Sequence, residues 1–292
     1  MRIAALAMLA AACGAPRPGL DRDRASALFT RVTVDTGGDH GLSGLAVAAD
    51  GTLWTVAERG AVALAITLTG DRGTAVRHPV TGVPPGQDLE AAAMADDGLW
   101  VGTEGHDAGV ARVYHLARQG DALVATGAPL EVRDAEVGVR IGANHGAEGV
   151  CSAGALVGVA LEEVGVTDGR RWAPLVTVDT ATGARRVQRV MLTSPTGKLS
   201  ALDCWRDGDR VRAVAVERHF EVTRLLGFDI GGVDPVIAPT VLLDLAPVLR
   251  GSLNLEGLVR LPDGRLVAVV DNQYRTITGP DELLVFRAPL AP

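Results

Sequence analysis

Acidic residues recur at two fixed places in five similar segments of the sequence. Each segment opens with Ser or Glu and closes on a carboxylate 14 to 17 residues later. The opening residues are Ser43, Glu90, Glu148, Ser200 and Glu256, and the closing residues are Glu58, Glu104, Glu162, Glu217 and Asp271. Carboxylate oxygens bind hard cations such as Ca²⁺, and carboxyl groups also act as general acids and bases. If the fold brings these positions together, they form a shared acidic site.

Between its two marked positions, each segment reads as a β-hairpin. Apolar and polar residues alternate in runs such as "LWTVAER" and "VRAVAVER", which is typical of strands. Four segments carry an Asp-Gly turn, at Asp50, Asp97, Asp207 and Asp263, and the third has Ala153-Gly154 instead. The start of the first strand and the end of the second lie at the same end of a hairpin. The two marked positions of each segment are therefore expected to lie side by side.

The spacing of the segments predicts an all-β fold, a β-propeller. The opening residues recur every 47 to 58 residues, which is typical of four-stranded blades. Five four-stranded blades are predicted, with six blades as the alternative and a two-domain β-sandwich as the competing architecture. The last segment is followed by a single strand-like run, so "ALFTRVTVD" (27–35) is expected to complete that blade and close the ring.

In a propeller the first strand of each blade lies nearest the axis. Glu90, Glu148 and Glu256 are therefore expected at one mouth of a central channel, with the closing acids around the same rim. Like charges in a confined site raise one another's pKa, so a cation or basic side chains must compensate. We predict a divalent cation, Ca²⁺, held by Glu90, Glu148, Glu256 and Asp271. The structural alternative is that the closing acids accept hydrogen bonds from the backbone of the next blade.

Basic residues cluster at the same places. Arg59 and Arg218 each follow a closing acid, and four of the six histidines flank the segments: His40, His106, His145 and His219. We interpret His145 and His40 as candidate general bases, and Arg59 and Arg218 as candidate binders of an anionic substrate; the alternative for each histidine is an ordinary loop residue. Ser43 reads as a small hydroxyl in a crowded channel, because the sequence has no Gly-x-Ser-x-Gly motif around a serine nucleophile.

The N-terminus resembles an export signal. Arg2 precedes the apolar run 3–12 and then Cys13, as in a bacterial lipoprotein, with ordinary secretion as the alternative. We predict a signal peptide over 1–12, lipidation of Cys13, a tether over 13–26 and one propeller domain over 27–292. The protein would be exported to the periplasm or the outer-membrane or cell surface. Cys151 and Cys204 are then left as a disulfide or as two buried thiols.

The net charge and the composition limit the classes of molecule that the protein is expected to bind. The net charge of −7 argues against nucleic acid, and aromatic residues make up only 3% of the chain, which leaves no obvious stacking platform. The apolar run at the N-terminus is shorter than the roughly 20 residues that a transmembrane helix needs, and no other stretch could span a bilayer. We expect a monomer that binds a small molecule at the channel mouth and meets the membrane only through its lipid anchor.

The combination of "GLSGLAVAADGTLWTVAERG", "DLEAAAMADDGLWVGTEG", "GAEGV" and "NLEGLVRLPDGRLVAVVDN" resembles the bacterial phytase-like family described as esterase-like activity of phytase. The likeness covers most of residues 37–288. The positions that match its blocks are Ser43, Glu90, Glu148, Glu256, Asp271 and Asn272. The resemblance implies an exported β-propeller with hydrolase-like activity. Two departures are Glu58, where an Asp is expected, and the missing Asp-Gly turn of the third segment.

Three functional hypotheses remain open at the level of sequence. The first is a metal-dependent hydrolase of phosphate or carboxylic esters at the acidic channel. The second is a non-catalytic surface module that binds a ligand or a protein. The third is a lactonase-type propeller with one axial divalent ion held by Glu256, Asn144 and Asp271.

Overall fold

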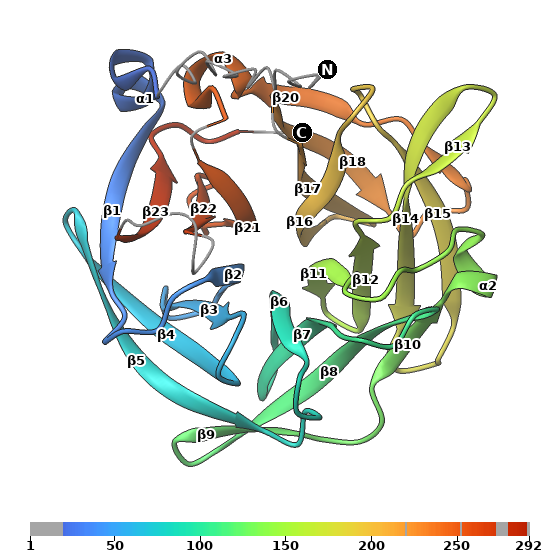
Figure 1. Cartoon of the computed structure of the whole chain (residues 1–292), viewed down its shortest axis with the longest axis horizontal. Helices are drawn as coiled ribbons and strands as arrows, with labels where there is room; N and C mark the ends of the chain where they lie inside the picture. The colour runs from blue at the N-terminus through green and yellow to red at the C-terminus, as the bar shows by residue number, and fades with distance from the viewer. Residues whose placement is uncertain (1–19, 220, 252, 273–279, 291–292) are drawn as a thin grey trace, which may run out of the picture.

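The strands form groups arranged around a central axis, with the first strand of each repeat nearest that axis (Figure 1). This computed structural model describes residues 20–219, 221–251, 253–272 and 280–290. The five innermost strands contact one another in a closed cycle. The predicted fold class, an all-β propeller, is confirmed.

Antiparallel pairing joins the strands within each repeat. The first set comprises β2 (Leu42–Val47), β3 (Leu53–Ala57), β4 (Val62–Thr69) and β5 (Arg72–Thr81). The second comprises β6 (Asp88–Ala95), β7 (Gly98–Glu104), β8 (Val110–Gln119), β9 (Ala122–Ala125) and β10 (Leu130–Arg133). The third comprises β11 (Ala147–Ala153), β12 (Leu156–Leu161), β13 (Gly165–Thr167), β14 (Arg170–Asp179) and β15 (Arg185–Met191).

Two further sets complete the described strands. The fourth comprises β16 (Lys198–Asp207), β17 (Arg210–His219), β18 (Val222–Ile230) and β20 (Thr240–Asp244). The fifth comprises β21 (Asn254–Arg260), β22 (Leu266–Asp271), β23 (Asp281–Phe286) and β1 (Phe29–Asp35). The N-terminal strand β1 thus pairs with the C-terminal strand β23, as predicted for closure of the ring.

Short parallel pairings also link neighbouring sets at their outer edges. Strand β5 pairs with β1 and β9, and β15 pairs with β19 (Val236–Ile237). These links merge the first, second and fifth sets into one 13-stranded sheet. Because sheets and repeats do not coincide, the blade number stays a prediction.

Every opening residue of a repeat lies at a break in the pairing register between the first two strands. The breaks fall between Ser43 and Ala46, Leu89 and Ala91, Ala147 and Gly149, Leu199 and Ala201, and Leu255 and Gly257. A β-bulge takes one residue out of the alternation and redirects its side chain. The same local irregularity therefore acts on Glu90, Glu148 and Glu256.

Small residues follow the opening positions because the inner strands approach closely. A Cβ atom on Gly257 would lie 2.6 Å from the carbonyl carbon of Gly44, and one on Gly149 would lie 2.7 Å from Cβ of Leu202. Beside Glu148 and Glu256, the space enclosed by the five inner strands has a volume of only about 10 Å³. The axis next to these acids is therefore packed rather than open as the predicted channel.

The N-terminal region differs from the predicted tether. Helix α1 (Arg22–Leu28) begins after Asp21, whose Oδ1 accepts a hydrogen bond from Arg24 N at 3.2 Å. Ala25 is buried, and the helix contacts α3 (Ala246–Leu249). Residues 22–26, expected as part of the tether, are thus helical because they pack on the fold. The signal segment 1–12 and Cys13 lie outside the described residues.

Two further features bear on the predictions. Cys151 of β11 and Cys204 of β16 form a disulfide between neighbouring inner strands, with Cα atoms 5.4 Å apart. A short helix, α2 (Asp134–Val137), follows β10. Within the described ranges, none of the helices has the length and apolarity to cross a membrane.

Candidate functional site

One cavity of about 350 Å³ gathers carboxylates from the inner hairpins. It is lined by Glu58, Asp88, Glu90, Glu104, Glu148, Glu162, Glu256 and Asp271, together with Arg59, Arg218 and Asn254. We call this cavity the acid pocket. The predicted convergence of Glu90, Glu148 and Glu256 at one end of the molecule is confirmed. All four residues predicted as cation ligands line the pocket.

Glu217 is the exception among the closing acids. Its side chain is fully buried and accepts hydrogen bonds from the amide and hydroxyl of Thr193 and of Ser194. A Cβ atom on Gly197 would lie 2.3 Å from Oε1 of Glu217, so the loop 193–197 is tightly folded around it. For this residue the rim position expected from the sequence is wrong. Its role is structural, but its partners lie in the loop before β16 and not in the next blade.

Asp88 and Asn254 belong to the pocket but were not predicted. Each lies two residues before an opening Glu, at the first residue of its strand. Lys198 occupies the same position before Ser200 and forms an ion pair with Glu162. The first and third repeats have Gly41 and Gly146 at this position, so a comparison of the repeats gives only a weak signal for it.

Part of the negative charge is neutralised by direct contacts. The Arg218 guanidinium donates to both oxygens of Glu256, with Nε 3.2 Å from Oε2. The Asn254 amide bridges Glu256 and Asp271 at 2.7 and 2.9 Å. Arg218 is therefore engaged by a protein carboxylate, which argues against the predicted role as an anchor for an anionic substrate.

Glu90 and Glu148 lack such partners. Each residue is only 7% exposed, and no described residue forms a hydrogen bond or ion pair with the Glu148 side chain that would neutralise it. Burial, followed by the neighbouring carboxylates, raises the pKa of Glu90 and of Glu148 well above the usual range. Deprotonation of these two acids is therefore opposed both by burial and by the neighbouring carboxylates.

The closing acids of the first two repeats also hold protons more tightly. Burial raises the pKa of Glu58 to about 8, with further contributions from Asp271, Glu256 and Asp88, while Arg59 lowers it. Burial likewise raises the pKa of Glu104 to about 7, with Glu162 as the next cause. A hydrogen bond with Glu90 acts in the opposite direction on the pKa of Glu104. Carboxyl groups of this kind can donate a proton near neutral pH.

The two candidate bases are placed differently. His145 does not line the pocket, but its Nδ1 lies 2.9 Å from Oε1 of Glu162, which does, and 3.1 Å from Oε1 of Glu163, although no aligned hydrogen bond forms. His40 Nδ1 lies 3.2 Å from Oδ2 of Asp281 and does not line the pocket. The structure therefore argues against His40 as a general base at this site.

The remaining sequence hypotheses can be placed as well. Ser43 is fully buried and donates to the carbonyl oxygen of Glu90 at 2.5 Å, which is a structural contact. Ser200 makes the same contact to Leu255 O at 2.9 Å. Asn144 Oδ1 contacts His106 at 2.9 Å and does not line the pocket. The lactonase-type ligand set is therefore not brought together, and Asn254 takes the position near Glu256 and Asp271.

The side chains of the acid pocket have the right chemistry for a metal ion but not the right spacing. Several uncompensated carboxylates are the ligands that a hard cation prefers. Yet the described His, Cys, Asp and Glu side chains contain no group of three that could hold an ion. Their present spacing therefore does not form a ready metal site.

Comparison with known proteins identifies the family but not the chemistry. No curated protein matches the sequence. Similar folds include the PQQ-bound form of aldose sugar dehydrogenase from Streptomyces coelicolor, with 13% identity, 89% of this chain and 98% of that chain covered, and a TM-score of 0.47. A luciferin-regenerating enzyme has 11% identity, 89% and 80% coverage, and a TM-score of 0.48. Neither similarity carries an argument about activity.

The family comparison rests on sequence and spans all five opening residues. The family profile described as esterase-like activity of phytase matches residues 37–274. This range includes every residue that lines the acid pocket. The chain therefore belongs to the phytase-like family.

Proposed function

We propose that the acid pocket is the active site of a hydrolase acting on phosphate or carboxylic esters. The observation that carries this proposal is the convergence of eight carboxylates in one cavity, where Arg59, Arg218 and Asn254 are the other polar lining groups. Burial holds protons on several of these carboxyls near neutral pH. Family membership supports the ester class.

Proton transfer is the chemistry that these residues suit best. Glu104 has a pKa of about 7 and so carries a proton on a large share of molecules at neutral pH, and it can donate this proton to the leaving oxygen. Glu90 forms a hydrogen bond with Glu104 and stabilises the carboxylate that Glu104 becomes after it donates the proton. His145, beside Glu162, is the proposed acceptor of the proton from the attacking water. Arg59, which is exposed and lines the pocket, would hold an anionic part of the substrate.

We further propose that a divalent cation, Ca²⁺, assists the reaction. A bound cation would neutralise the carboxylates and polarise the ester oxygen. A phosphate ester needs this help most, because the acidic walls repel an anion. A neutral carboxylic ester or lactone meets no such repulsion, so its hydrolysis is expected to depend less on the cation.

A second function is favoured by one specific observation. Glu148 is buried without a neutralising contact among the described residues, as expected of a site that captures a cationic ligand. A binding module would use the same pocket without turnover. Hydrolysis therefore has to be measured separately from binding.

Localisation and assembly remain proposals that rest on the sequence. We propose an exported, monomeric lipoprotein attached through Cys13, in the periplasm or at the outer-membrane or cell surface. The disulfide between Cys151 and Cys204 supports an oxidising compartment. Metabolic labelling with a radioactive fatty acid tests this point, since Cys13→Ala should remove the label.

The test of the proposed function is a substrate screen on the mature protein. 4-Nitrophenyl acetate, 4-nitrophenyl phosphate and a γ-lactone would be assayed with Ca²⁺ and with EDTA. We expect turnover of at least one ester, a loss of about 100-fold or more in Glu104→Gln, and a stronger EDTA effect for the phosphate ester. Ca²⁺ binding without turnover of any class would support the binding module, and full activity in Glu104→Gln would contradict the proposed acid.

A further inference from the structure

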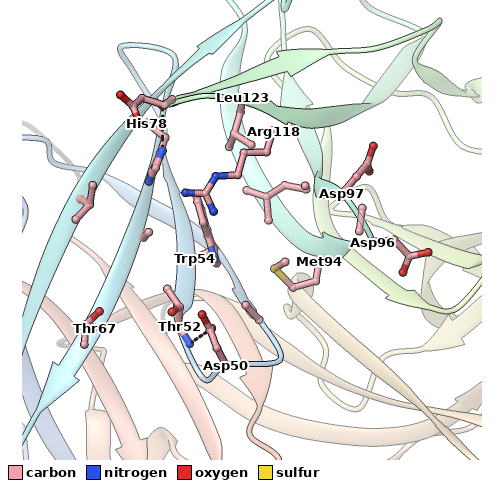
Figure 2. A pocket seen from close by; sticks show the side chains of 17 residues that line it. Asp50, Thr52, Trp54, Thr67, His78, Met94, Asp96, Asp97, Arg118 and Leu123 are labelled. Atoms are coloured by element: carbon pink, nitrogen blue, oxygen red, sulfur yellow. Dashed lines mark hydrogen bonds between the residues drawn. The ribbon is translucent and has the colours of Figure 1, made fainter.

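A second and larger cavity lies on the opposite face, where the hairpin turns are. It has a volume of about 600 Å³ and is lined by residues of the first two strand sets, including the turn residues Asp50 and Asp97. We call it the turn-face pocket (Figure 2). Its walls include the apolar side chains of Met94, Leu99 and Leu123. The acid pocket and the turn-face pocket share no lining residue.

A positive group reaches into this pocket. The Arg118 guanidinium lies over the Trp54 ring, with its central carbon 5.8 Å from the ring centroid (Figure 2). Within the described part of the chain, no carboxylate forms an ion pair with Arg118. Arg118 is exposed, so its hydrogen-bond donors can meet a ligand carboxylate at the pocket.

His78 adds a buried polar group on the same wall. It is only 5% exposed and lies against Trp54, with ring centroids 4.9 Å apart and the ring planes tilted by 40°. Its Nδ1 lies 3.0 Å from the carbonyl oxygen of Asp121, and because a carbonyl can only accept, Nδ1 carries the proton. In this tautomer Nε2 is an acceptor, and no described residue donates to it. A ligand with a hydrogen-bond donor would satisfy this atom.

Carboxylates occupy the rim of the pocket. Asp97 is paired with His115, whose Nε2 lies 2.8 Å from Oδ1, and Asp50 accepts a hydrogen bond from the Thr52 amide at 2.9 Å. Asp96 and Asp121 are exposed. These carboxylates and Arg118 line the same pocket, so positive and negative groups lie near one another. A simple anion would be repelled by this rim, and a simple cation would leave Arg118 unused.

We propose that the turn-face pocket binds a small zwitterion, an α-amino acid with an apolar side chain. Its carboxylate pairs with Arg118, its ammonium group meets His78 Nε2 and the rim carboxylates, and its side chain contacts Met94 and Leu123. The carboxylate and the ammonium group of an α-amino acid lie close together, as Arg118 and the rim carboxylates do in the pocket. This inference does not depend on the proposed hydrolase function.

Three probes that share one aromatic body test the proposal. L-Phenylalanine is the zwitterion, 2-phenylethylamine lacks the carboxylate and 3-phenylpropionate lacks the amine. Calorimetric titration should show that L-phenylalanine binds at least about tenfold more tightly than either analogue. Arg118→Gln should lower the affinity for L-phenylalanine by at least about tenfold and leave that for 2-phenylethylamine unchanged.

Two control variants check that binding is confined to the turn-face pocket. Arg72→Gln removes the same charge from an exposed residue of β5 outside the pocket and should change nothing. Glu148→Gln, in the acid pocket, should also leave the binding of L-phenylalanine intact. The proposal is overturned if L-phenylalanine does not bind at millimolar concentration, if 2-phenylethylamine binds equally well, or if Arg118→Gln has no effect.

Discussion

Glu217 and Glu148 are two buried carboxylates of the same propeller with opposite surroundings. Glu217 receives four hydrogen bonds from Thr193 and Ser194, whereas Glu148 faces other acids across the acid pocket. Their burial is similar, at 0% and 7% exposure. The difference indicates that the partners of a buried acid, rather than its burial, decide whether its ionised form is stabilised or remains costly.

The largest expected effect is the loss of the Glu217 contacts. Glu217→Gln replaces one acceptor oxygen with a donor that faces other donors, so the variant should lose about 3 kcal/mol of unfolding free energy. Urea denaturation at pH 7 measures this loss. Glu221→Gln, an exposed neighbour, is the matched control and should stay within about 0.5 kcal/mol of the wild type. A small effect of Glu217→Gln would show that its hydrogen bonds contribute little.

The next effect concerns the ion pair between Arg218 and Glu256 in the acid pocket. Arg218→Gln would leave Glu256 buried without its cation, which should cost about 2 kcal/mol at pH 8. The cost should be smaller at pH 5, where Glu256 can take up a proton. Denaturation at the two pH values checks this prediction, and an equal loss at both would contradict it.

The pH dependence of the wild type follows from Glu58 and Glu104. Their pKa values, about 8 and about 7 in the folded protein, exceed the ordinary value of 4.5. Between these values the folded state binds more protons than the unfolded state, so stability falls as pH rises. We expect a lower melting temperature at pH 8.5 than at pH 5.5, with a smaller difference in Glu58→Gln. A melting temperature that rises over this range would refute the prediction.

A smaller effect of opposite sign is expected at Glu148. Burial and the neighbouring carboxylates oppose the ionisation of Glu148, so Glu148→Gln should raise stability by about 1 kcal/mol at a pH high enough to ionise the wild-type residue. At pH 5, where the wild-type residue is protonated, the gain should vanish. A Glu→Gln substitution is thus expected to destabilise the protein at Glu217 and to stabilise it at Glu148. Destabilisation at both positions would remove the distinction between them.

The smallest effect is expected at Ser43. Ser43→Ala removes the hydrogen bond to Glu90 O and should cost about 1 kcal/mol. Because the hydroxyl is buried and bonded to the backbone, any ester hydrolysis should persist. Loss of turnover with unchanged stability would instead indicate a serine nucleophile.

The sequence predicted those features that repeat. The spacing of the opening residues indicated a propeller, the alternation indicated hairpins, and these together placed Glu90, Glu148 and Glu256 at one end. The closure by residues 27–35 followed from the missing outer strand of the last repeat. Each of these inferences depends on regular geometry that a repeated pattern carries.

Features set by local irregularity were not predictable in the same way. The direction of the Glu217 side chain depends on the loop 193–197, which occurs once in the chain. Helix α1 forms because Ala25 packs on the fold, a tertiary contact that the tether-like composition conceals. Asp88 and Asn254 lie two places before an opening residue, where the first and third repeats have Gly41 and Gly146, so the repeated pattern marks them only weakly.

The most direct test of the central claim is whether acid-pocket carboxyls exchange protons for a cation. Titration of Ca²⁺ into the protein at pH 7, in two buffers of different ionisation enthalpy, measures binding and proton release together. Binding with release of protons, both abolished by Glu148→Gln and unaffected by Glu221→Gln, is the predicted result. Absence of Ca²⁺ binding, or binding that Glu148→Gln leaves intact, would contradict the account.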